Sequence, residues 1–560
     1  MQYTGARIIL ECLKEQGVDT VFGYPGGAVL NIYNEIYSFE GIKHILTAHE
    51  QGAAHAADGY ARATGKVGVC LATSGPGATN LVTGIANAYM DSIPMVAITG
   101  QVPTSLLGKD SFQEVDIIGI TMPITKHNFI VKNVEDLAPT IRRAFKIARS
   151  GRPGPVLIDM PKDVTAAVYE YTPLADIDKE QSKDMCSDQL AEAIELINNS
   201  KKPVVVVGGG CNISASQEEL LALAEKLKCP VCSTMMGLGA FNGNHPMYTG
   251  MLGMHGTIAS NRCLVKSDLI IAIGARFSDR VISNPKTFAA NKRVLHIDID
   301  EAEVSKNIKA DSWIIGDVAD VLAELTKAVE TKEEREWIDY ALDLIKQTKE
   351  RAERVLKINP KTSVNPIYVV NKIQELTKGE AVLTTEVGQN QIWATQGYTY
   401  TKPRTLITSG GLGTMGYGFG AAIGASVGLN KPVFDIAGDG SFRMNINELA
   451  TAVRFNIPVK IILLNNSVLG MVRQWQNLFY DHRFSSTTLE RETDFVKIAE
   501  GYGALGIKVN TNDEVEEALK KAMEYNGPVV VDFTVHQDFM ASPMVAPGAD
   551  ISEIMTLDQE

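Results

Sequence analysis

Two stretches near opposite ends of this chain repeat the same order of features. The Ser-Gly-Pro-Gly of residues 74–77 aligns with the Gly-Asp-Gly-Ser of residues 438–441, and the segments downstream stay in step without a gap. In both copies the glycine loop opens a helical stretch that leads to an apolar strand, residues 95–99 or 459–464. Further along, residues 154–159 are echoed by residues 527–532. The two ends of the chain are therefore predicted to be related domains.

Short β-branched strands that alternate with helices indicate parallel sheets, because parallel strands need crossover connections and are covered on both faces. The stretch between the two copies shows the same alternation, with apolar strands at residues 203–207, 269–273 and 294–299. The glycines after the first of these strands do not form a GxGxxG pattern, which argues against an ordinary dinucleotide site. We expect an α/β protein of three doubly wound parallel-sheet domains, the outer two related by duplication.

The length of 560 residues is too great for one hydrophobic core and favours roughly three or four domains. Two stretches have the composition of linkers: residues 172–188 are polar and aperiodic, and residues 331–365 are a charged helical stretch ending in a loop with Pro360. The expected division is an N-terminal domain at 1–172, a central domain at 189–330, a linker at 331–365, a C-terminal domain at 366–545 and a tail at 546–560.

The strongest chemical signal lies in the C-terminal copy. Asp439 follows an apolar strand, and Asn466 follows the next strand along the chain. These side chains can meet at neighbouring strand tips, where their oxygens suit a small divalent cation. The helix between them has an N-terminus that can accept phosphate. The pair predicts a site for a magnesium-bridged diphosphate, although Asp439 alone could simply cap the following helix.

Composition excludes several other classes of protein. Apolar residues make up 45% of the chain and charged residues 21%, and no apolar stretch approaches the length of a membrane span. A net charge of −13 without a Lys/Arg cluster disfavours nucleic acid as a partner. The first residues have no export signal, so we expect a cytoplasmic protein. Seven cysteines do not form a disulfide framework, and Cys229 and Cys232 are expected to be buried thiols.

The Gly-Asp-Gly to Asn-Asn spacing resembles the motif of thiamine diphosphate (ThDP) enzymes. Taken alone, Glu50 would be a solvated helix residue and Met415 a core residue. Beside that motif, residues 48–62 resemble the glutamate helix of the family, whose carboxylate holds N1′ of the aminopyrimidine and so favours the tautomer that removes the C2 proton. Met415 matches the apolar side chain that bends the cofactor into its reactive shape.

The resemblance implies further cofactor contacts. Asp439, Asn466 and the carbonyl of Val468 match the Mg²⁺ ligands. Because Glu50 and the Gly-Asp-Gly loop lie on different outer domains, which meet across subunits in this family, a dimer is the minimum expected assembly. The N-terminal domain would bind the pyrimidine and the C-terminal domain the diphosphate and Mg²⁺. The expected ThDP contacts are Glu50, Val387, Gly388, Gln389, Met415, Gly438, Asp439, Gly440, Ser441, Asn466 and Met471.

Four further segments narrow the family, since several reactions share this scaffold. They are residues 24–27, 108–114, 274–280 and 470–476, and they resemble the catalytic large subunit of acetohydroxyacid synthase, also called acetolactate synthase, over nearly the whole chain. The resemblance implies that pyruvate is decarboxylated on ThDP. The hydroxyethyl unit is then ligated to pyruvate or 2-ketobutyrate, the first common step of valine, leucine and isoleucine biosynthesis.

The same resemblance assigns substrate contacts. Arg276 matches the residue that holds the second ketoacid's carboxylate, a task for a planar two-pronged donor, and its alternative is an ordinary ion pair. Trp475 matches the tryptophan that favours 2-ketobutyrate, where one methylene discriminates by about 1–3 kcal/mol; its alternative is core packing. Gly27, Phe112 and Gln113 are expected to line the reaction chamber, with Gln101 and Lys162 nearby.

Biosynthetic members of the family also bind FAD in the middle domain, without a redox step in the overall reaction. One position departs from the family: Ser278 stands where an aspartate is usual, which removes an acidic group near the flavin. The residues that match the flavin site are Arg152, Thr234, Met235, Gly253, Met254, His255, Gly274, Arg276, Asp279, Asp298, Ile299 and Asp317.

The nearest alternatives are a flavin-dependent pyruvate oxidase and a flavin-free catabolic acetolactate synthase. Residues 474–476 argue against the oxidase, and the Arg-Phe-x-Asp-Arg pattern of residues 276–280 against the flavin-free enzyme. Glu50 excludes a glyoxylate carboligase, and intact Glu50, Asp439 and Asn466 argue against an inactive regulatory chain. The expected partners are 2-ketoacids, further copies in a homodimer or homotetramer, and a separate small regulatory subunit; no nucleic acid or membrane is expected.

Overall fold

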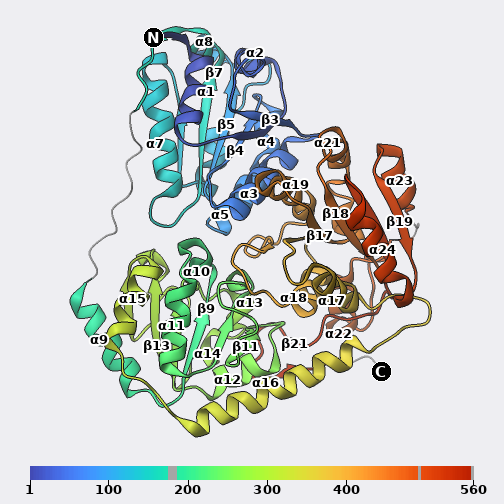
Figure 1. Cartoon of the computed structure of the whole chain (residues 1–560). Coiled ribbons are helices and arrows are strands. Elements are labelled where there is room, and N and C mark those ends of the chain that lie inside the picture. Colours follow the sequence, from blue (N-terminus) through green and yellow to red (C-terminus); the bar gives the residue numbers. More distant parts are fainter. Residues whose placement is uncertain (175–185, 490–492, 557–560) are drawn as a thin grey trace.

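The computed structural model describes residues 1–174, 186–489 and 493–556. Three six-stranded parallel sheets, each covered by helices on both faces, account for most of these residues. Figure 1 shows the corresponding bodies: blue for the N-terminal part, green for the middle part, and orange to red for the C-terminal part. The predicted α/β class of three doubly wound sheets is confirmed.

The N-terminal sheet has the order β3-β2-β4-β5-β7-β6. Its strands are almost wholly buried in the centre and rich in Val, Ile and Ala, as parallel strands covered on both faces require. Helices α1 (Gly5–Glu15) and α7 (Leu137–Arg149) pack on one face, and α3 (Glu50–Thr64) and α5 (Val82–Met90) on the other. The strands are β2 (Thr20–Gly23), β3 (Lys43–Leu46), β4 (Gly68–Ala72), β5 (Met95–Gln101), β6 (His127–Ile130) and β7 (Pro155–Pro161).

The C-terminal sheet has the order β16-β15-β17-β18-β20-β19, which is the same order as in the N-terminal sheet when strands are counted along the chain. Helices α17 (Pro366–Thr377), α18 (Gln389–Gly397) and α24 (Asn512–Glu524) cover one face, and α19 (Tyr417–Leu429), α21 (Leu449–Arg454) and α23 (Phe495–Tyr502) the other. The strands are β15 (Leu383–Thr385), β16 (Leu406–Ile407), β17 (Val433–Gly438), β18 (Val459–Asn465), β19 (Leu505–Val509) and β20 (Val529–Thr534).

Helices α3 and α19 precede corresponding strands, β4 and β17, and they pack on each other more extensively than any other two elements in the described residues. Small residues allow this approach. A Cβ on Gly59 would lie 2.2 Å from the carbonyl oxygen of Ala421, and one on Gly424 would lie 1.8 Å from that of Ala56. The two related domains therefore meet through equivalent helices, backbone against backbone.

The middle sheet has a different order, β11-β10-β9-β12-β13-β14. Counted along the chain this is 3-2-1-4-5-6, the order of dinucleotide-binding sheets, although the glycine fingerprint is absent. Gly208 makes the turn after β9 possible, because a Cβ there would lie 2.0 Å from the carbonyl oxygen of Gly274. The strands are β9 (Pro203–Val207), β10 (Val231–Ser233), β11 (Tyr248–Met251), β12 (Leu269–Ile273), β13 (Arg293–Asp298) and β14 (Ser312–Ile315).

The helices of the middle part lie on both faces of that sheet and lead into the second linker. The long helix α16 (Arg335–Leu356) runs beneath the middle part toward the C-terminal part, the yellow helix along the lower edge of Figure 1. Most of the first predicted linker lies outside the described residues. The remaining helices of this part are α9 (Ser187–Asn199), α10 (Gly209–Ser214), α11 (Gln217–Leu227), α12 (Ile258–Lys266), α13 (Asp279–Ile282), α14 (Pro285–Phe288) and α15 (Val318–Ala328).

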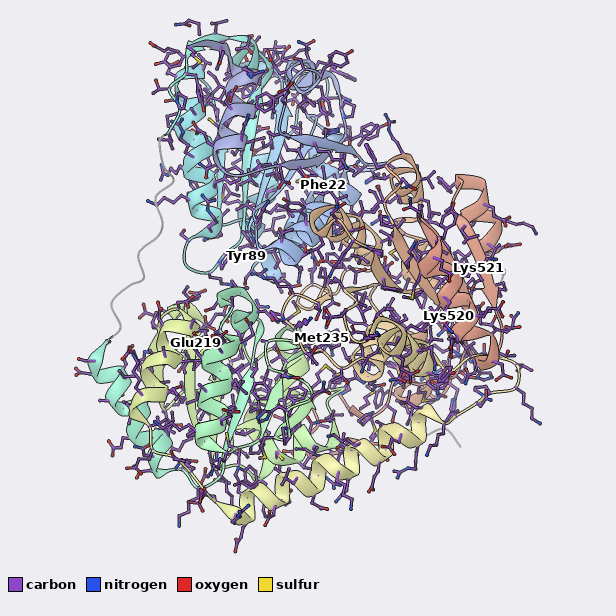
Figure 2. The ribbon with its side chains drawn as sticks, viewed as in Figure 1. Phe22, Tyr89, Glu219, Met235, Lys520 and Lys521 are labelled. Carbon is purple, nitrogen blue, oxygen red and sulfur yellow. The ribbon has the colours of Figure 1, made fainter. Side chains whose placement is uncertain are left out.

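The cysteines are free thiols, and all but Cys186 are buried, including Cys229 and Cys232. Within the described part of the chain, no helix is both long and apolar enough to cross a membrane. Side chains fill the space between the ribbons throughout the three parts (Figure 2). Shorter elements near the functional region are α2 (Leu30–Ile36), α4 (Pro76–Asn80), α8 (Lys162–Ala166), α20 (Asp439–Phe442) and α22 (Gly470–Phe479).

Candidate active site

A small cavity of about 60 Å³ lies where β15, β17 and β18 of the C-terminal sheet end. The segments that follow these strands and the loop that carries Met415 form its walls, as expected for a ligand site at the carboxyl ends of parallel strands. Every residue predicted to contact ThDP lines this cavity except Glu50. The shared residues are Val387, Gly388, Gln389, Met415, Gly438, Asp439, Gly440, Ser441, Asn466 and Met471.

Asp439 is buried at the wall of this small cavity, and neither of its carboxylate oxygens has a hydrogen-bond partner among the described residues. Burial raises the pKa of Asp439 to about 6, an effect that Arg443 and nearby backbone N–H groups oppose. The alternative that Asp439 caps α20 is not seen, because its side chain accepts no capping bond. A buried carboxylate without a partner is costly unless a cation binds it, so the site fits a divalent metal ion.

Asn466 lies beside this carboxylate and is held by its neighbours. Its Oδ1 accepts a hydrogen bond of 3.3 Å from the backbone of Val468, and its Nδ2 donates to Oε1 of Gln389 at 3.2 Å. Gln389 in turn donates to Oε1 of Gln474 at 2.8 Å. This chain of amides connects the predicted metal ligand to α22, whose only buried residue is Gln474.

Met415 reaches the small cavity from the loop before α19. Its Cε lies 3.9 Å from the position that a Cβ on Gly440 would take, so the thioether lies over the Gly-Asp-Gly-Ser turn. Such a place suits a wedge beneath a cofactor whose diphosphate is held by that turn. The geometry is compatible with the predicted role rather than with plain core packing, because Met415 lines an open space.

Glu50 begins α3 in the N-terminal part and does not line the small cavity. It does not line a second, larger cavity among the three parts of the chain either. Its Oε2 accepts a hydrogen bond of 3.0 Å from Asn80, and its Oε1 lies close to Gly77. The backbone of Gln113 packs on Gly75, an earlier glycine of the same loop, with φ of 59° at Gln113. Glu50 and Gln113 therefore lie at one end of the N-terminal sheet, whereas the metal site lies at the end of the C-terminal sheet.

The other predicted chamber residues are near this end too. Gly27 begins a short helical turn whose Ala28 N–H bonds to Thr73, and Lys162 begins α8. Gln101 ends β5, where it binds the carboxylate of Asp159. Phe112 is 88% exposed, an unusual state for a large apolar side chain. Gly27, Gln101 and Lys162 therefore lie where strands of the N-terminal sheet end, and Phe112 directly precedes Gln113.

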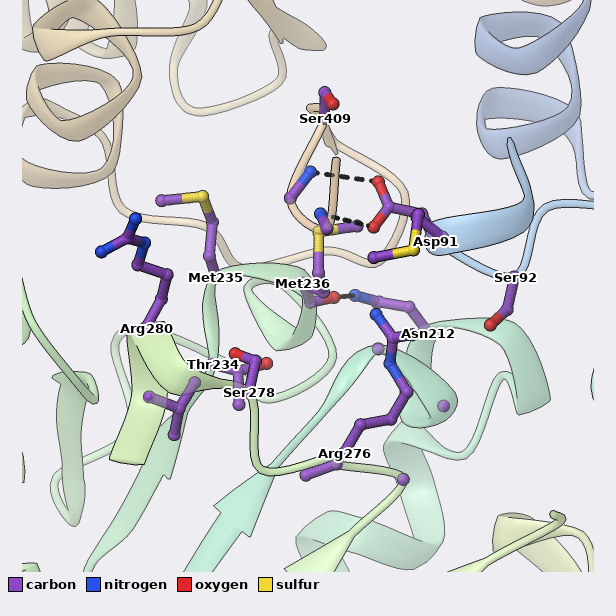
Figure 3. A pocket seen from close by; sticks show the side chains of 18 of the residues that line it. Asp91, Ser92, Asn212, Thr234, Met235, Met236, Arg276, Ser278, Arg280 and Ser409 are labelled. Atoms are coloured by element: carbon purple, nitrogen blue, oxygen red, sulfur yellow. Dashed lines mark hydrogen bonds between the residues drawn. The ribbon is translucent and has the colours of Figure 1, made fainter. Parts of the chain in front are cut away.

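The larger cavity, of about 940 Å³, lies among the three parts of the chain (Figure 3). It opens at the carboxyl ends of β9, β12 and β13, the point where the order of the middle sheet reverses. Every residue predicted for the flavin lines it except Gly253. The shared residues are Arg152, Thr234, Met235, Met254, His255, Gly274, Arg276, Asp279, Asp298, Ile299 and Asp317.

Opposite charges line this large cavity. Arg152 bonds to Glu303 at 2.6 Å and to Ser92 at 2.8 Å. Burial, and then the nearby Arg152, lower the pKa of Arg276, whose side chain points toward the cavity in Figure 3. Ser278 is exposed at the rim and forms no capping bond to α13. The cavity can hold a large ligand that carries anionic groups and an apolar part.

Trp475 lines the large cavity from α22 and is only half-buried, which does not match a core residue. The guanidinium of Arg280 lies 5.7 Å from its ring centroid, and its Nε1 is buried without a hydrogen-bond partner in the described residues. The two cavities share Val387, Gly388 and Met471 in their walls. A ligand of the small cavity and one of the large cavity would therefore be neighbours.

Two carboxylates accept hydrogen bonds from the loop that carries Met415, and sequence reasoning did not predict these contacts. Asp91 accepts hydrogen bonds from the backbone of Gly410 at 3.0 Å and Gly411 at 2.7 Å, as Figure 3 shows. It also pairs with Arg62 at 2.9 Å. The second is Glu386, in the loop after β15: residues 386–390 resemble the family's loop that touches the pyrimidine and the diphosphate, but the contact of Glu386 with the Met415 loop was not predicted. The spacing of Asp58 and Arg62 on the small-residue helix, one turn apart, was a usable signal of a buried ion pair.

Comparison with known proteins gives consistent results. Three family models match: thiamine pyrophosphate enzyme N-terminal TPP binding domain at residues 3–120, central domain at 190–325, and C-terminal TPP binding domain at 386–533. The chain is 48% identical to an acetolactate synthase large subunit of Corynebacterium glutamicum, over 98% of this chain and 90% of the relative.

Two further relatives come from distant organisms. A probable acetolactate synthase large subunit of Methanocaldococcus jannaschii is 47% identical over 98% of this chain and 95% of its own length. An acetolactate synthase large subunit of Buchnera aphidicola is 45% identical over 100% of this chain and 99% of its own length. The similarity thus includes all three sheets and both cavities.

Proposed function

This chain belongs to the acetolactate synthase large subunits of the thiamine pyrophosphate enzyme family, and we propose how its residues divide the work of that reaction. The enzyme is a ThDP-dependent carboligase that converts two pyruvates and one proton into acetolactate and CO₂. ThDP supplies an acidic carbon whose conjugate base attacks a ketoacid carbonyl and accepts the electron pair that CO₂ leaves behind. The protein binds and orients the cofactor and the ketoacids, and it favours the cofactor tautomer that removes the C2 proton.

Asp439, Asn466 and the carbonyl oxygen of Val468 hold Mg²⁺ at the diphosphate end. The observation that carries this assignment is the buried carboxylate of Asp439 with both oxygens unpartnered among the described residues. The short helix α20 and the backbone N–H groups of Gly440 and Ser441 face the same small cavity and suit phosphate oxygens. Met415 supports the cofactor from the loop before α19.

Glu50 holds the aminopyrimidine from a second copy of the chain. Support comes from its place outside both cavities and from the exposed Phe112, which directly precedes Gln113 at the same end of the N-terminal sheet. A two-fold dimer covers such a surface and brings the glutamate of one copy to the diphosphate cavity of the other. The cofactor's activating group and its metal site then belong to different subunits.

The shared site can be tested by complementation. Glu50→Gln and Asp439→Gly are each expected to give a nearly inactive enzyme. A mixed dimer of the two variants contains one site with both residues intact and one site with neither. After reversible dissociation and mixing, each mixed dimer is therefore expected to have up to about half the activity of a wild-type dimer. Activity that stays absent in mixtures with demonstrated subunit exchange would mean that each chain completes its own site.

FAD occupies the large cavity. Support comes from the 3-2-1-4-5-6 sheet order, the size of the cavity and the cluster of Arg152 and Arg276 near its floor. Ser278 makes the rim less acidic than an aspartate would. The flavin is a resident group here, since carboligation exchanges no electrons.

Arg276 and Trp475 receive the second ketoacid where the two cavities adjoin. The guanidinium binds its carboxylate, and the indole contacts the extra methyl of 2-ketobutyrate. Trp475→Leu is expected to lower the preference for 2-ketobutyrate over pyruvate by about tenfold, measured with both ketoacids in competition. Tyr480→Leu, directly after the same helix but 56% exposed, is the matched control and is expected to leave the preference unchanged.

The decisive test of the reaction is a product assay. Purified protein with ThDP, Mg²⁺, FAD and pyruvate is expected to form acetolactate, detected as acetoin after acid decarboxylation. Acetyl phosphate or hydrogen peroxide as the main product would instead identify a pyruvate oxidase. Activity without FAD in flavin-free protein would favour the catabolic synthase.

The relatives' designation as large subunits supports a further proposal, that a separate small subunit associates with this chain. Cytoplasmic location is proposed with it, as expected for an enzyme of amino-acid biosynthesis. Co-purification with tagged chain from the source cells, followed by an activity assay with and without the partner, tests the first point.

A further inference from the structure

Glu386 is completely buried in the loop after β15, and its carboxylate accepts hydrogen bonds from two separate segments. One oxygen accepts from the backbone of Phe419 at 3.0 Å. The other accepts from the backbone of Gly416 at 2.8 Å and from the hydroxyl of Ser441 at 2.5 Å. Hydrogen bonds to a buried carboxylate are among the strongest that a side chain makes.

These donors belong to the two segments that matter most at the small cavity. Gly416 directly follows Met415, and Ser441 ends the Gly-Asp-Gly-Ser turn that begins at Gly438. Ser441 also accepts a hydrogen bond of 3.0 Å from the backbone of Gly416, so a closed triangle joins the two segments through Glu386. Because its hydroxyl donates to Glu386, Ser441 has only its backbone N–H to offer a phosphate group.

A second buried acid lies close by. Asp435, on the neighbouring strand β17, is buried, accepts a hydrogen bond of 3.0 Å from Thr384, and has one oxygen without a partner in the described residues. Burial, and then the negative charge of Glu386, raise the pKa of Asp435 well above its ordinary value. Burial also raises the pKa of Glu386, but the two acids differ in their donors: Asp435 has the one from Thr384, whereas Glu386 has three. Glu386, with its several donors, carries the charge.

We propose that Glu386 is a positioning residue that locks the Met415 wedge to the Gly-Asp-Gly-Ser turn, so that binding of the diphosphate fixes the bent, activated shape of the cofactor. The proposal rests on the proposed functions of Met415 and Asp439. Without the Glu386 carboxylate, the turn can still bind Mg²⁺ and diphosphate, but Met415 is held to it only through Gly416, by the remaining bonds to Ser441 and Asn445. The cofactor then binds without being held in the shape that removes its C2 proton.

Glu386→Gln tests the lock, because it keeps the side-chain shape and replaces an acceptor oxygen with a donor. The first measurement is the rate of C2 hydrogen–deuterium exchange of bound ThDP at saturating ThDP and Mg²⁺, without ketoacid. We expect the exchange to slow at least about tenfold, equal to about 1.4 kcal/mol of barrier. The second is the near-ultraviolet circular dichroism band of the bound aminopyrimidine, which is expected to weaken while calorimetry still shows ThDP binding.

Asp435→Asn is the matched control. It is the same change of acid to amide at an equally buried site of the same sheet, but within the described chain Asp435 bonds neither to the Met415 loop nor to the glycine turn. We expect wild-type exchange and a wild-type dichroism band. A Glu386→Gln protein that exchanges at the wild-type rate when saturated, or an Asp435→Asn protein that slows equally, would overturn the proposal and leave Glu386 with a structural role only.

Ser441→Ala removes the hydroxyl link from the other side and carries the test if Glu386→Gln does not fold. It is expected to slow exchange several-fold, and the wild-type rate in this variant would also contradict the lock. Where both variants fold, the double variant is expected to slow exchange by less than the product of the two single effects, because the two changes break a shared connection. Exchange needs no ketoacid, so a failure of carboligation in the wild type would leave this result readable.

Discussion

In the N-terminal sheet the loop after β4 turns at Gly75, and in the C-terminal sheet the corresponding loop after β17 turns at Asp439. Gly75 has φ of 58°, and a Cβ there would lie 2.9 Å from the backbone of Gln113, so protein closes this end of the sheet. In the C-terminal copy, Asp439 lines a cavity, and its two carboxylate oxygens have no partner among the described residues. One scaffold thus serves two purposes: one copy presents a glutamate beside a closed loop, and the other an open metal site.

The shared scaffold remains visible inside the sheets. Gln101 donates to Asp159 at 3.0 Å in the N-terminal copy, and at the corresponding strand positions Asn465 donates to Asp532 at 3.0 Å in the C-terminal copy. The copies therefore retain an amide–acid bond between neighbouring strands while their loops have diverged. With the roles proposed for Asp439 and Glu50, cofactor binding and cofactor activation are divided between the copies at the strand ends.

Asp439→Gly breaks the comparison most severely, because it gives the C-terminal loop the glycine that the N-terminal loop has at Gly75. The metal site loses the one carboxylate proposed for it. We expect Mg²⁺-dependent affinity for ThDP to fall by more than about 100-fold, since loss of even a supporting group of a metal ligand costs about 10- to 100-fold. Calorimetry of the cofactor-free protein measures it. Affinity within tenfold of the wild type would show that Asp439 does not hold the metal.

Glu50→Gln makes the opposite change, removing activation while keeping the metal site. We expect ThDP affinity within a few-fold of the wild type and C2 exchange slowed by about 100-fold or more, the lower end of what proton-transfer groups contribute. Exchange followed by acid quench and magnetic resonance measures the rate. Unchanged exchange would remove the assigned role of Glu50. Equal losses of affinity in the two variants would remove the division of labour.

Much of this organisation could be predicted from the sequence. The gap-free repeat predicted two related sheets, and local patterns placed most strands, because buried parallel strands are short β-branched runs. Every residue that the resemblance assigned to ThDP or FAD lines one of the two cavities, except Glu50 and Gly253. The order 3-2-1-4-5-6 of the middle sheet could not be predicted, since strand order depends on crossovers between distant segments rather than on local pattern.

The hydrogen bonds that hold the Met415 loop also could not be predicted from the sequence. Asp91 belongs to no recognised motif, and the resemblance of residues 386–390 to a cofactor-binding loop says nothing of what Glu386 holds. The backbone N–H groups that these acids accept from lie more than 300 and about 30 positions away in the chain. Only the folded geometry shows that both hold the same loop. Glu50 was found by resemblance, but its distance from the metal cavity within one chain became evident only in the structure.

The packing of α3 on α19 tests whether the two copies are equivalent where they meet. Gly59→Ala and Gly424→Ala each place a methyl against a carbonyl of the facing helix backbone, which cannot move aside as a side chain could. Each is expected to cost about 2 kcal/mol or more of stability, seen as a lower Tm. Gly501→Ala in α23 is the control, because nothing lies near its Cβ among the described residues, and a neutral or slightly higher Tm is expected. A loss at only one of the two helix positions would mean that the interface is not reciprocal.

The retained amide–acid pair differs between the two copies in the charge of the groups that surround its acid. In the C-terminal copy Lys508 lies 3.0 Å from Asp532, whereas the hydrogen bonds that Asp159 accepts from described side chains come from the neutral groups of Thr99 and Gln101.

Burial raises the pKa of Asp159 to about 7, and Asp116 adds to the effect. Its folded-state pKa lies above the unfolded value, so its contribution to stability is full below the unfolded pKa and is lost as the pH rises toward about 7. Relative to Asp159→Asn, the wild type should therefore lose up to about 1.4 kcal/mol per pH unit between about pH 4 and 7, and nothing further above it. Thermal unfolding of both proteins across this range measures the difference, and parallel curves would contradict it. Asp532→Asn, which leaves Lys508 without its carboxylate, is expected to lower the Tm.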